Sequence, residues 1–276
     1  MNASRARMIW SVVTWTIVLA VVFPLIWMIV TSVKPQSELF SIPPTLMPET
    51  VTFEHYWRLL TDTPFLQYFR NSMILAVTTT VVVVVLGTLG AYSLVRFKYR
   101  GRETLATLVL FTYLMPSVVL VVPLYLMMAK LGLANTLASL VIAYTTFALP
   151  YALWLLRSFM SSIPVDLESA ALVDGADRMG AFVDVILPQA LPGIVSTALF
   201  TFILCWNEYL FALVLVNSDS VRPLTAGTMN MLITSFNIDW SLLMAASVMM
   251  SLPLIVIFTF LQGTLTKGFG AGAVKG

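Results

Sequence analysis

The sequence predicts an all-α integral membrane protein with six transmembrane helices and one cytoplasmic loop of two short helices. Of its 276 residues, 59% are apolar and 10% are charged, and the mean hydropathy is +0.93. Water-soluble domains do not have this composition. Several apolar runs are long enough to cross a hydrocarbon core of about 30 Å, which takes about 20 residues of α-helix.

Apolar runs and their flanking charges place the six spans. We expect them at residues 8–32, 68–95, 104–128, 137–159, 191–216 and 240–266. The first run follows Arg5 and Arg7, as a signal peptide would. However, it is longer than the roughly 7 to 15 residues of a cleavable core, and no small-residue cleavage site follows it. A retained span is therefore expected.

The basic residues predict the orientation. With the amino terminus inside, most of the 15 Lys and Arg residues lie on the cytoplasmic side, and the segment 96–102 is their densest cluster. This distribution follows the positive-inside bias and predicts that both termini are cytoplasmic. The formal net charge of +2 does not suggest a nucleic-acid partner. The single His55 and the single Cys205 predict no metal site and no catalytic residue.

Two outer segments connect the spans. The segment 34–69 contains five prolines, so extended or turn structure is expected there. The segment 217–239 begins with polar residues and is expected to contact an external partner.

The cytoplasmic loop between the fourth and fifth spans predicts two short helices. Ser162 can cap the first helix, Pro164 suits an early helical position, and Asp166 and Glu168 place negative charge near its positive end. Gly175 can adopt the left-handed conformation that ends this helix.

Asp177 can cap the second helix. The side chains expected on one apolar face of this helix are Met179, Phe182, Val183 and Ile186. Small side chains on the first helix, at Ala170 and Ala171 beside Leu167, predict that it seats in the groove of a partner.

The loop resembles that of ABC importer permeases, whose pattern is E-A-A, three residues, G, and then, after nine or so residues, I-x-L-P or a close variant. The matching residues are Ala170, Ala171, Gly175, Ile186, Leu187 and Pro188. Ser169 stands where the motif has its glutamate, and Glu168 precedes it. Other segments are similar to the carbohydrate (maltose/trehalose-type) branch, namely Asp174-Gly175-Ala176, the segment 91–97 from Ala91 to Phe97, and Trp206-Asn207-Glu208.

The resemblance implies a type-1 ABC permease in the plasma (inner) membrane of a bacterium or archaeon. Its parts are a first helix and outer loop at 1–67, a permease core at 68–268 with the coupling loop at 162–188, and a cytoplasmic tail at 269–276. The implied partners are a sister permease subunit, a homodimeric ATP-binding subunit and an external sugar-binding protein. This chain has no G-x-x-x-x-G-K-[ST] phosphate loop, so no cofactor is expected in it, and ATP and Mg²⁺ belong to the partner ATPase. The residues expected to couple to that ATPase are Asp166, Glu168, Ser169, Ala170, Ala171, Asp174, Gly175 and Asp177.

Polar side chains inside the spans suggest a path for sugar. They are Tyr144, Trp206, Asn207 and Glu208, since rings can stack on sugars while amides and carboxylates bond hydroxyls. The same residues also suit an anchor at the membrane interface or a contact with the sister subunit. An ion-coupled secondary transporter remains the alternative, because six spans with polar groups fit that class too.

Overall fold

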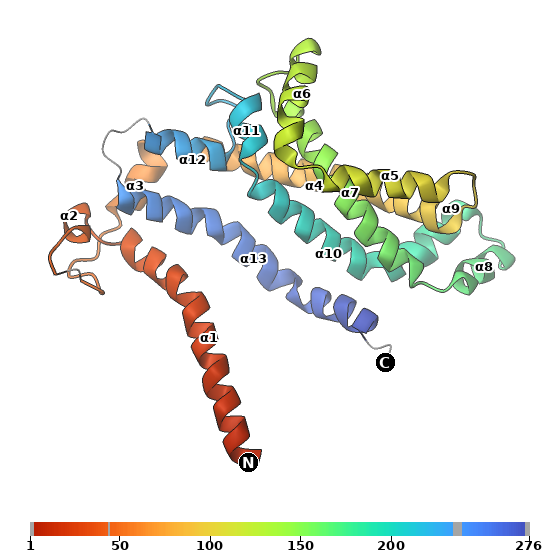
Figure 1. Ribbon diagram of the computed structural model, residues 1–276, viewed down its shortest axis with the longest axis horizontal. Helices are drawn as coiled ribbons and strands as arrows, with labels where there is room; N and C mark the ends of the chain where they lie inside the picture. Colours follow the sequence, from red (N-terminus) through yellow and green to blue (C-terminus); the bar gives the residue numbers. More distant parts are fainter. Residues whose placement is uncertain (1–2, 44, 234–238, 274–276) are drawn as a thin grey trace. The chain divides into compact units, whose positions relative to one another are not determined.

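The computed structural model describes residues 3–43, 45–233 and 239–273, and within these ranges every regular element is a helix (Figure 1). The chain forms two compact units. One comprises Met1–Leu66 and Thr228–Pro253, and the other comprises Gln67–Gly227 and Leu254–Gly276.

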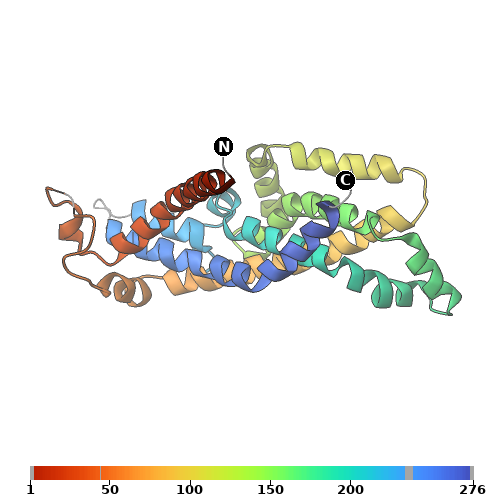
Figure 2. The ribbon, with the colours of Figure 1, turned by 90° about the horizontal axis from the view of Figure 1, so that it is seen from below.

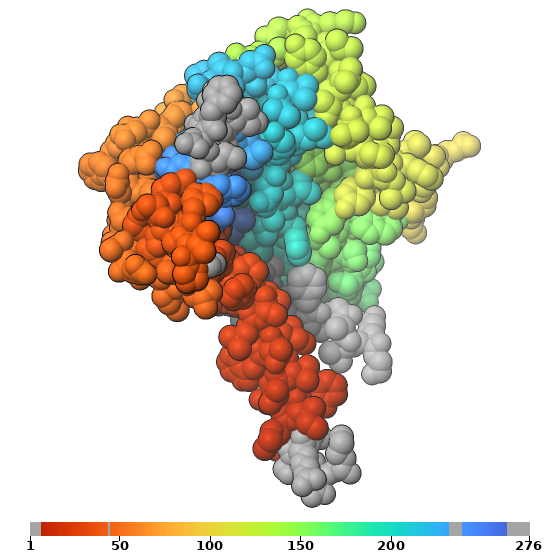
Figure 3. Space-filling view, turned by 60° about the vertical axis from the view of Figure 1, so that its left-hand side comes forward, coloured from red at the N-terminus to blue at the C-terminus, as the bar shows by residue number. Residues whose placement is uncertain are grey.

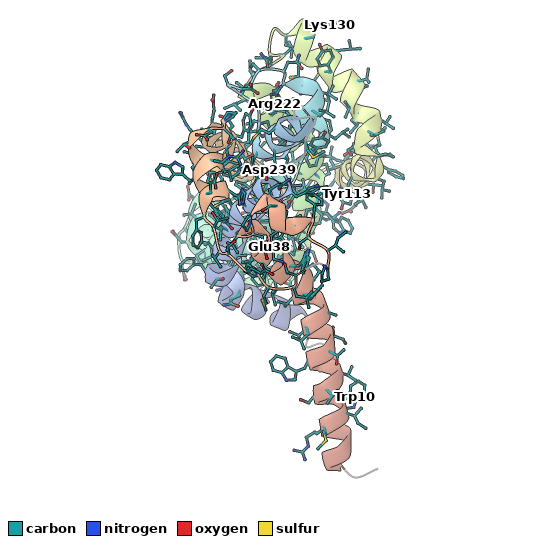
Figure 4. All side chains as sticks on the ribbon, turned by 90° about the vertical axis from the view of Figure 1, so that its left-hand side faces the viewer. Trp10, Glu38, Tyr113, Lys130, Arg222 and Asp239 are labelled. Carbon is teal, nitrogen blue, oxygen red and sulfur yellow. The ribbon has the colours of Figure 1, made fainter. Side chains whose placement is uncertain are left out.

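The first unit begins with α1 (Ala3–Ser32), a 30-residue helix that is apolar on all sides. Its side chains from Arg7 to Trp27 are exposed, as Trp10 illustrates at 67% (Figure 4). Because such a surface is unstable in water, lipid or other apolar helices must cover it. The unit also contains α2 (Gln36–Leu39), α3 (Glu54–Thr61) and the first part of α13 (Trp240–Ala273).

The proline-rich outer segment is more helical than the sequence predicts. The helix α3 forms in the proline-free stretch between Pro48 and Pro64, where every backbone N–H can donate. An ion pair of 3.0 Å joins Arg58 on α3 to Asp239, the residue before α13. His55 is buried, and its Nε2 lies 3.0 Å from the carbonyl oxygen of Lys34, so it has a structural role.

The second unit contains most of the remaining helices. They are α4 (Phe65–Arg96, whose first two residues belong to the other unit), α5 (Arg102–Leu114), α6 (Ser117–Lys130), α7 (Leu137–Ser161), α8 (Val165–Val173), α9 (Arg178–Gly180), the π-helix η1 (Ala181–Ile186), α10 (Leu187–Trp206) and α11 (Leu210–Leu215). Helix α12 (Leu224–Ile233) begins in this unit. Helix α7 is central, since it packs against α5, α6, α10 and α11.

Five helical segments within the described residues are long and apolar enough to cross a membrane. They are Arg7–Ser32, Phe65–Arg96, Leu137–Ser161, Arg178–Trp206 and Trp240–Gly263. The expected third span is instead a bent pair, because α5 and α6 meet at 100° (Figure 2). Pro116 explains the break: it has no N–H to donate and it disfavours helical backbone at Met115, whose ψ is 128°.

The fifth span also differs from the expected range of 191–216. Helix α10 ends at Trp206, and the short α11 starts at Leu210 after a break of three residues. Helix α11 packs against α6 and α7, and its contact with α6 is visible in the space-filling view (Figure 3). Cys205 is buried near the end of α10, as expected for a packed thiol.

Candidate coupling loop and translocation path

The two-helix loop forms between α7 and α10, at the end of the second unit where α4 ends and α5 begins (Figure 1). Gly175 has a φ of +94°, and the N–H of Ala176 donates to the carbonyl of Ala171 at 3.0 Å. This is the left-handed ending expected for α8. The Asp177 carboxylate accepts the N–H of Gly180 at 2.7 Å and so caps α9, also as expected.

The start of α8 differs from the expectation. The Ser162 hydroxyl donates to the carbonyl oxygen of Phe159 at 2.7 Å, so it belongs to the last turn of α7 and does not cap α8. Pro164 lies directly before the first helical residue, Val165. Its extended backbone (ψ 135°) separates the two helices.

The second short helix does not keep all its apolar side chains on one buried face. Phe182 and Ile186 are buried, but Met179 and Val183 are 64% and 46% exposed. The expected pattern assumed 3.6 residues per turn, whereas residues 181–186 form a π-helix with wider turns. The exposed pair therefore adds to the outer surface of the loop.

Glu168, one of the expected coupling residues, is buried inside the chain and is not exposed on the surface of α8. Its Oε1 accepts the hydroxyl of Tyr92 at 2.7 Å, and its Oε2 lies 2.9 Å from Nε of Arg96. Arg96 also donates to the carbonyl oxygen of Ile163 at 3.0 Å. The Arg96 and Glu168 side chains are 5% and 7% exposed. Glu168 thus attaches α8 to α4.

Aromatic packing completes this attachment. The Tyr92 and Phe182 ring centroids lie 4.5 Å apart, and the guanidinium of Arg178 lies 5.3 Å above the ring of Phe97. A contact of Tyr92 and Arg96 with the coupling loop was not predicted. Their spacing of four residues, which places both on one face of a helix, is the signal that indicates a shared partner.

The exposed surface of α8 consists of apolar side chains with acidic side chains among them. Its exposed apolar side chains are Val165, Leu167, Leu172 and Val173. Asp166, Ser169, Ala170 and Asp174 are exposed beside them, and Ala171 is half-buried. Glu168 is therefore the only expected coupling residue that is buried, and the others are exposed or half-buried.

The expected translocation residues cluster at the break between α10 and α11. The Glu208 carboxylate accepts the N–H groups of Phe211 and Ala212 at 2.8 and 3.2 Å, so it caps α11. Its backbone carbonyl accepts the hydroxyl of Thr225 at 2.6 Å. The buried Tyr144 hydroxyl lies next to the same carboxylate, outside hydrogen-bonding geometry.

Two of the four expected residues are inaccessible. Tyr144 is 1% exposed, and Trp206 is 2% exposed. The ring of Trp206 stacks on Phe202 and meets Phe69 edge-on, with both centroid separations at 5.6 Å. Only Asn207 of the four is exposed, and its amide donates to the carbonyl oxygen of Ile203. Among the described residues, no three His, Cys, Asp or Glu side chains gather as metal ligands would.

Comparison with known proteins identifies relatives of this fold. A chain in the crystal structure of a bacterial ABC transporter involved in the import of the acidic polysaccharide alginate matches with a TM-score of 0.82. The match covers 95% of this chain and 98% of that one, at 23% sequence identity. The architecture is therefore that of an ABC importer permease.

Sequence relatives cover nearly the whole chain. The inner membrane ABC transporter permease protein YcjP of Escherichia coli is 36% identical over 92% of this chain and 91% of its own length. The trehalose/maltose transport system permease protein MalG of Thermococcus litoralis has the same identity and coverage. The trehalose transport system permease protein SugB of Mycobacterium tuberculosis is 35% identical over all of both chains.

The family match is long enough to identify the chain. Residues 83–270 match the family described as "Binding-protein-dependent transport system inner membrane component". This range includes the C-terminal part of α4, the bent pair, the two-helix loop and the broken fifth span. The chain belongs to this family of inner membrane components of binding-protein-dependent transport systems.

Proposed function

We propose that the chain is the permease subunit of an ATP-driven importer of di- or oligosaccharides. It forms part of the translocation path and couples to an ATPase through the loop 162–188 by alternating access. The substrate class is supported by MalG and SugB, which are named for trehalose and maltose transport. The ion-coupled transporter finds no support among these relatives.

The single observation that carries the coupling assignment is the surface of α8. Val173 is 86% exposed and Val165 is 59% exposed on a short helix whose other face is fixed by the buried Glu168. Exposed apolar side chains on a rigidly held helix are suited to a groove in another protein. The partner proposed for this surface is an ATP-binding subunit that carries the ATP and Mg²⁺.

The remaining partners are those that the family resemblance implies. We propose that a sister permease subunit packs against the spans and that an external sugar-binding protein binds the outer segments 34–69 and 217–239. We also propose that both termini are cytoplasmic. The positive-inside distribution supports this orientation.

For the path itself, we propose that Asn207 and Glu208 lie beside the moving sugar. A broken span frees backbone and side-chain polar groups at membrane depth, as transporter binding sites require. Tyr144 and Trp206 are buried, so we propose that they pack beneath the site and do not contact the sugar.

Uptake in proteoliposomes tests the proposal. The chain is co-expressed with the neighbouring transporter subunits of its own genome, and uptake of radiolabelled trehalose and maltose is measured. We expect uptake that requires ATP inside and persists with ionophores that collapse ion gradients. Uptake that continues without ATP and stops with the ionophores would refute the proposal.

Two substitutions test the path. Asn207→Ala and Glu208→Gln should slow uptake while the subunits still co-purify. Ser158→Ala is a matched control on α7, near the proposed cytoplasmic ends. Normal uptake in both variants would remove these residues from the path.

A further inference from the structure

Helix α4 is attached to other segments at both of its ends through buried polar side chains. Its inner end holds α8 through Tyr92 and Arg96, as described above. Its outer end holds the loop between α11 and α12, residues 216–223, which we call the outer loop. All of these residues belong to the second unit.

Two buried side chains of α4 donate hydrogen bonds to the outer loop. The Tyr68 hydroxyl donates to Asp219 at 2.7 Å. The Asn71 amide donates to the carbonyl oxygens of Ser220 and Arg222 at 3.0 and 2.9 Å. Each of these buried donors would lose a partner if the outer loop moved away.

The first turn of α12 strengthens the same attachment. The Ser72 hydroxyl accepts the N–H of Leu224 at 2.7 Å. A Cβ added at Gly227 would lie 2.2 Å from Cδ2 of Tyr68, so the backbone there lies directly against the Tyr68 ring. The outer loop therefore has little freedom to move independently of α4.

Between the two attachments α4 is one continuous helix without proline. Tyr68 and Tyr92 are separated by about 36 Å along its axis, at about 1.5 Å per residue. A Cβ at Gly90 would lie 2.8 Å from a methyl group of Leu153, so the inner part of α4 lies close against α7. A helix supported in this way moves as a unit.

From these contacts we propose that α4 is a strut that transmits movement of the coupling helix α8 to the outer loop. Tyr92, Arg96 and Glu168 are the positioning residues at its inner end, and Tyr68, Asn71 and Ser72 are those at its outer end. The proposal rests on the proposed function, since an ATPase must move α8. It adds the route by which nucleotide binding inside changes the surface outside.

Hydrogen exchange of the intact importer tests the strut. Peptides covering 216–227 are compared between the nucleotide-free complex and the complex trapped with ATP and vanadate. The quantity of interest is the difference between the two states, because a purely structural role would change both states alike. In the wild-type complex we expect trapping to change the exchange of the outer loop.

Three Tyr→Phe variants give a matched series. Tyr92→Phe removes the bond to Glu168, and Tyr68→Phe removes the bond to Asp219. Tyr99 is 42% exposed in the loop after α4, so Tyr99→Phe is the control. We expect the trapping difference to shrink in the first two variants, to be lost in Glu168→Gln, and to stay at the wild-type value in the control.

Two results would overturn the strut: an outer loop that does not respond to trapping in the wild type, or a full response in Glu168→Gln with the ATPase bound. If Glu168→Gln does not assemble, Tyr92→Phe decides, because it keeps the ion pair to Arg96. A wild-type complex without a co-purifying ATPase would instead refute the proposed function.

Discussion

Substituting Gly175 with alanine tests whether the left-handed turn of the loop is needed to bind the ATPase. Gly175 has a φ of +94°, and an added Cβ would meet no atom within 4 Å. The penalty is therefore purely one of backbone conformation, and it is about 1–2 kcal/mol for a residue with a side chain. The free loop can relieve this strain by relaxing, but the bound loop cannot. The apparent affinity for the ATP-binding subunit should therefore fall by a factor of about 5 to 30.

Gly101→Ala is the matched control. Gly101 has a φ of +85°, and an added Cβ there also meets no atom within 4 Å, so the local penalty is similar. It lies between α4 and α5, outside the coupling loop. Titration of the purified permease with the ATP-binding subunit measures both variants. Equal affinities for the two variants would show that the turn at Gly175 has no special part in docking.

Three further outcomes follow from individual contacts. Gly193→Ala places a Cβ 2.4 Å from Cγ of Phe159, and the overpacking should cost about 1–3 kcal/mol, seen as a lower melting temperature in detergent. Asp177→Ala removes the cap of α9 and should cost about 0.5–2 kcal/mol, measured as faster amide exchange at the start of that helix. The N–H of Glu49 holds the pKa of the Glu38 carboxyl below its usual range. This contact therefore stabilises the segment 34–69 above the ordinary pKa of the group and is lost as pH falls through the lowered value. The protection factor of the Glu49 amide, which corrects for the slower intrinsic exchange in acid, should therefore fall.

The spans were the most predictable part of the fold, because the length of an apolar run depends on composition alone. Helices α4 and α7 begin and end within three residues of the expected ranges. The break at Met115 and Pro116 was not predicted. Prolines are tolerated inside membrane helices when neighbours compensate, and Pro123 and Pro150 do lie within helices. The sequence around a proline does not distinguish these outcomes.

The break in the fifth span has a clearer local cause. A carboxylate in an apolar run was interpreted as a group facing a cavity, yet Glu208 reaches two backbone N–H groups of the following turn. An acidic residue three positions before Phe211 is also the pattern of a helix start. If Glu208 is also interpreted as a helix start, the expected fifth span is divided at the observed place.

The two adjacent positions 168 and 169 show why the loop motif alone does not reveal which side chain is exposed. Successive helical residues point about 100° apart, so one of the pair faces α4 when the other faces outward. Glu168 is buried against Arg96, and Ser169 is exposed. A charge that docks on a partner must be at the exposed position, and here that position holds a hydroxyl whose oxygen lies 3.2 Å from the carbonyl oxygen of Val165. In the proposed function, the loop therefore binds the ATPase through the apolar surface of α8 and its remaining exposed acids. The inward carboxylate attaches α8 to α4, and in the proposed strut this attachment makes the two helices move together.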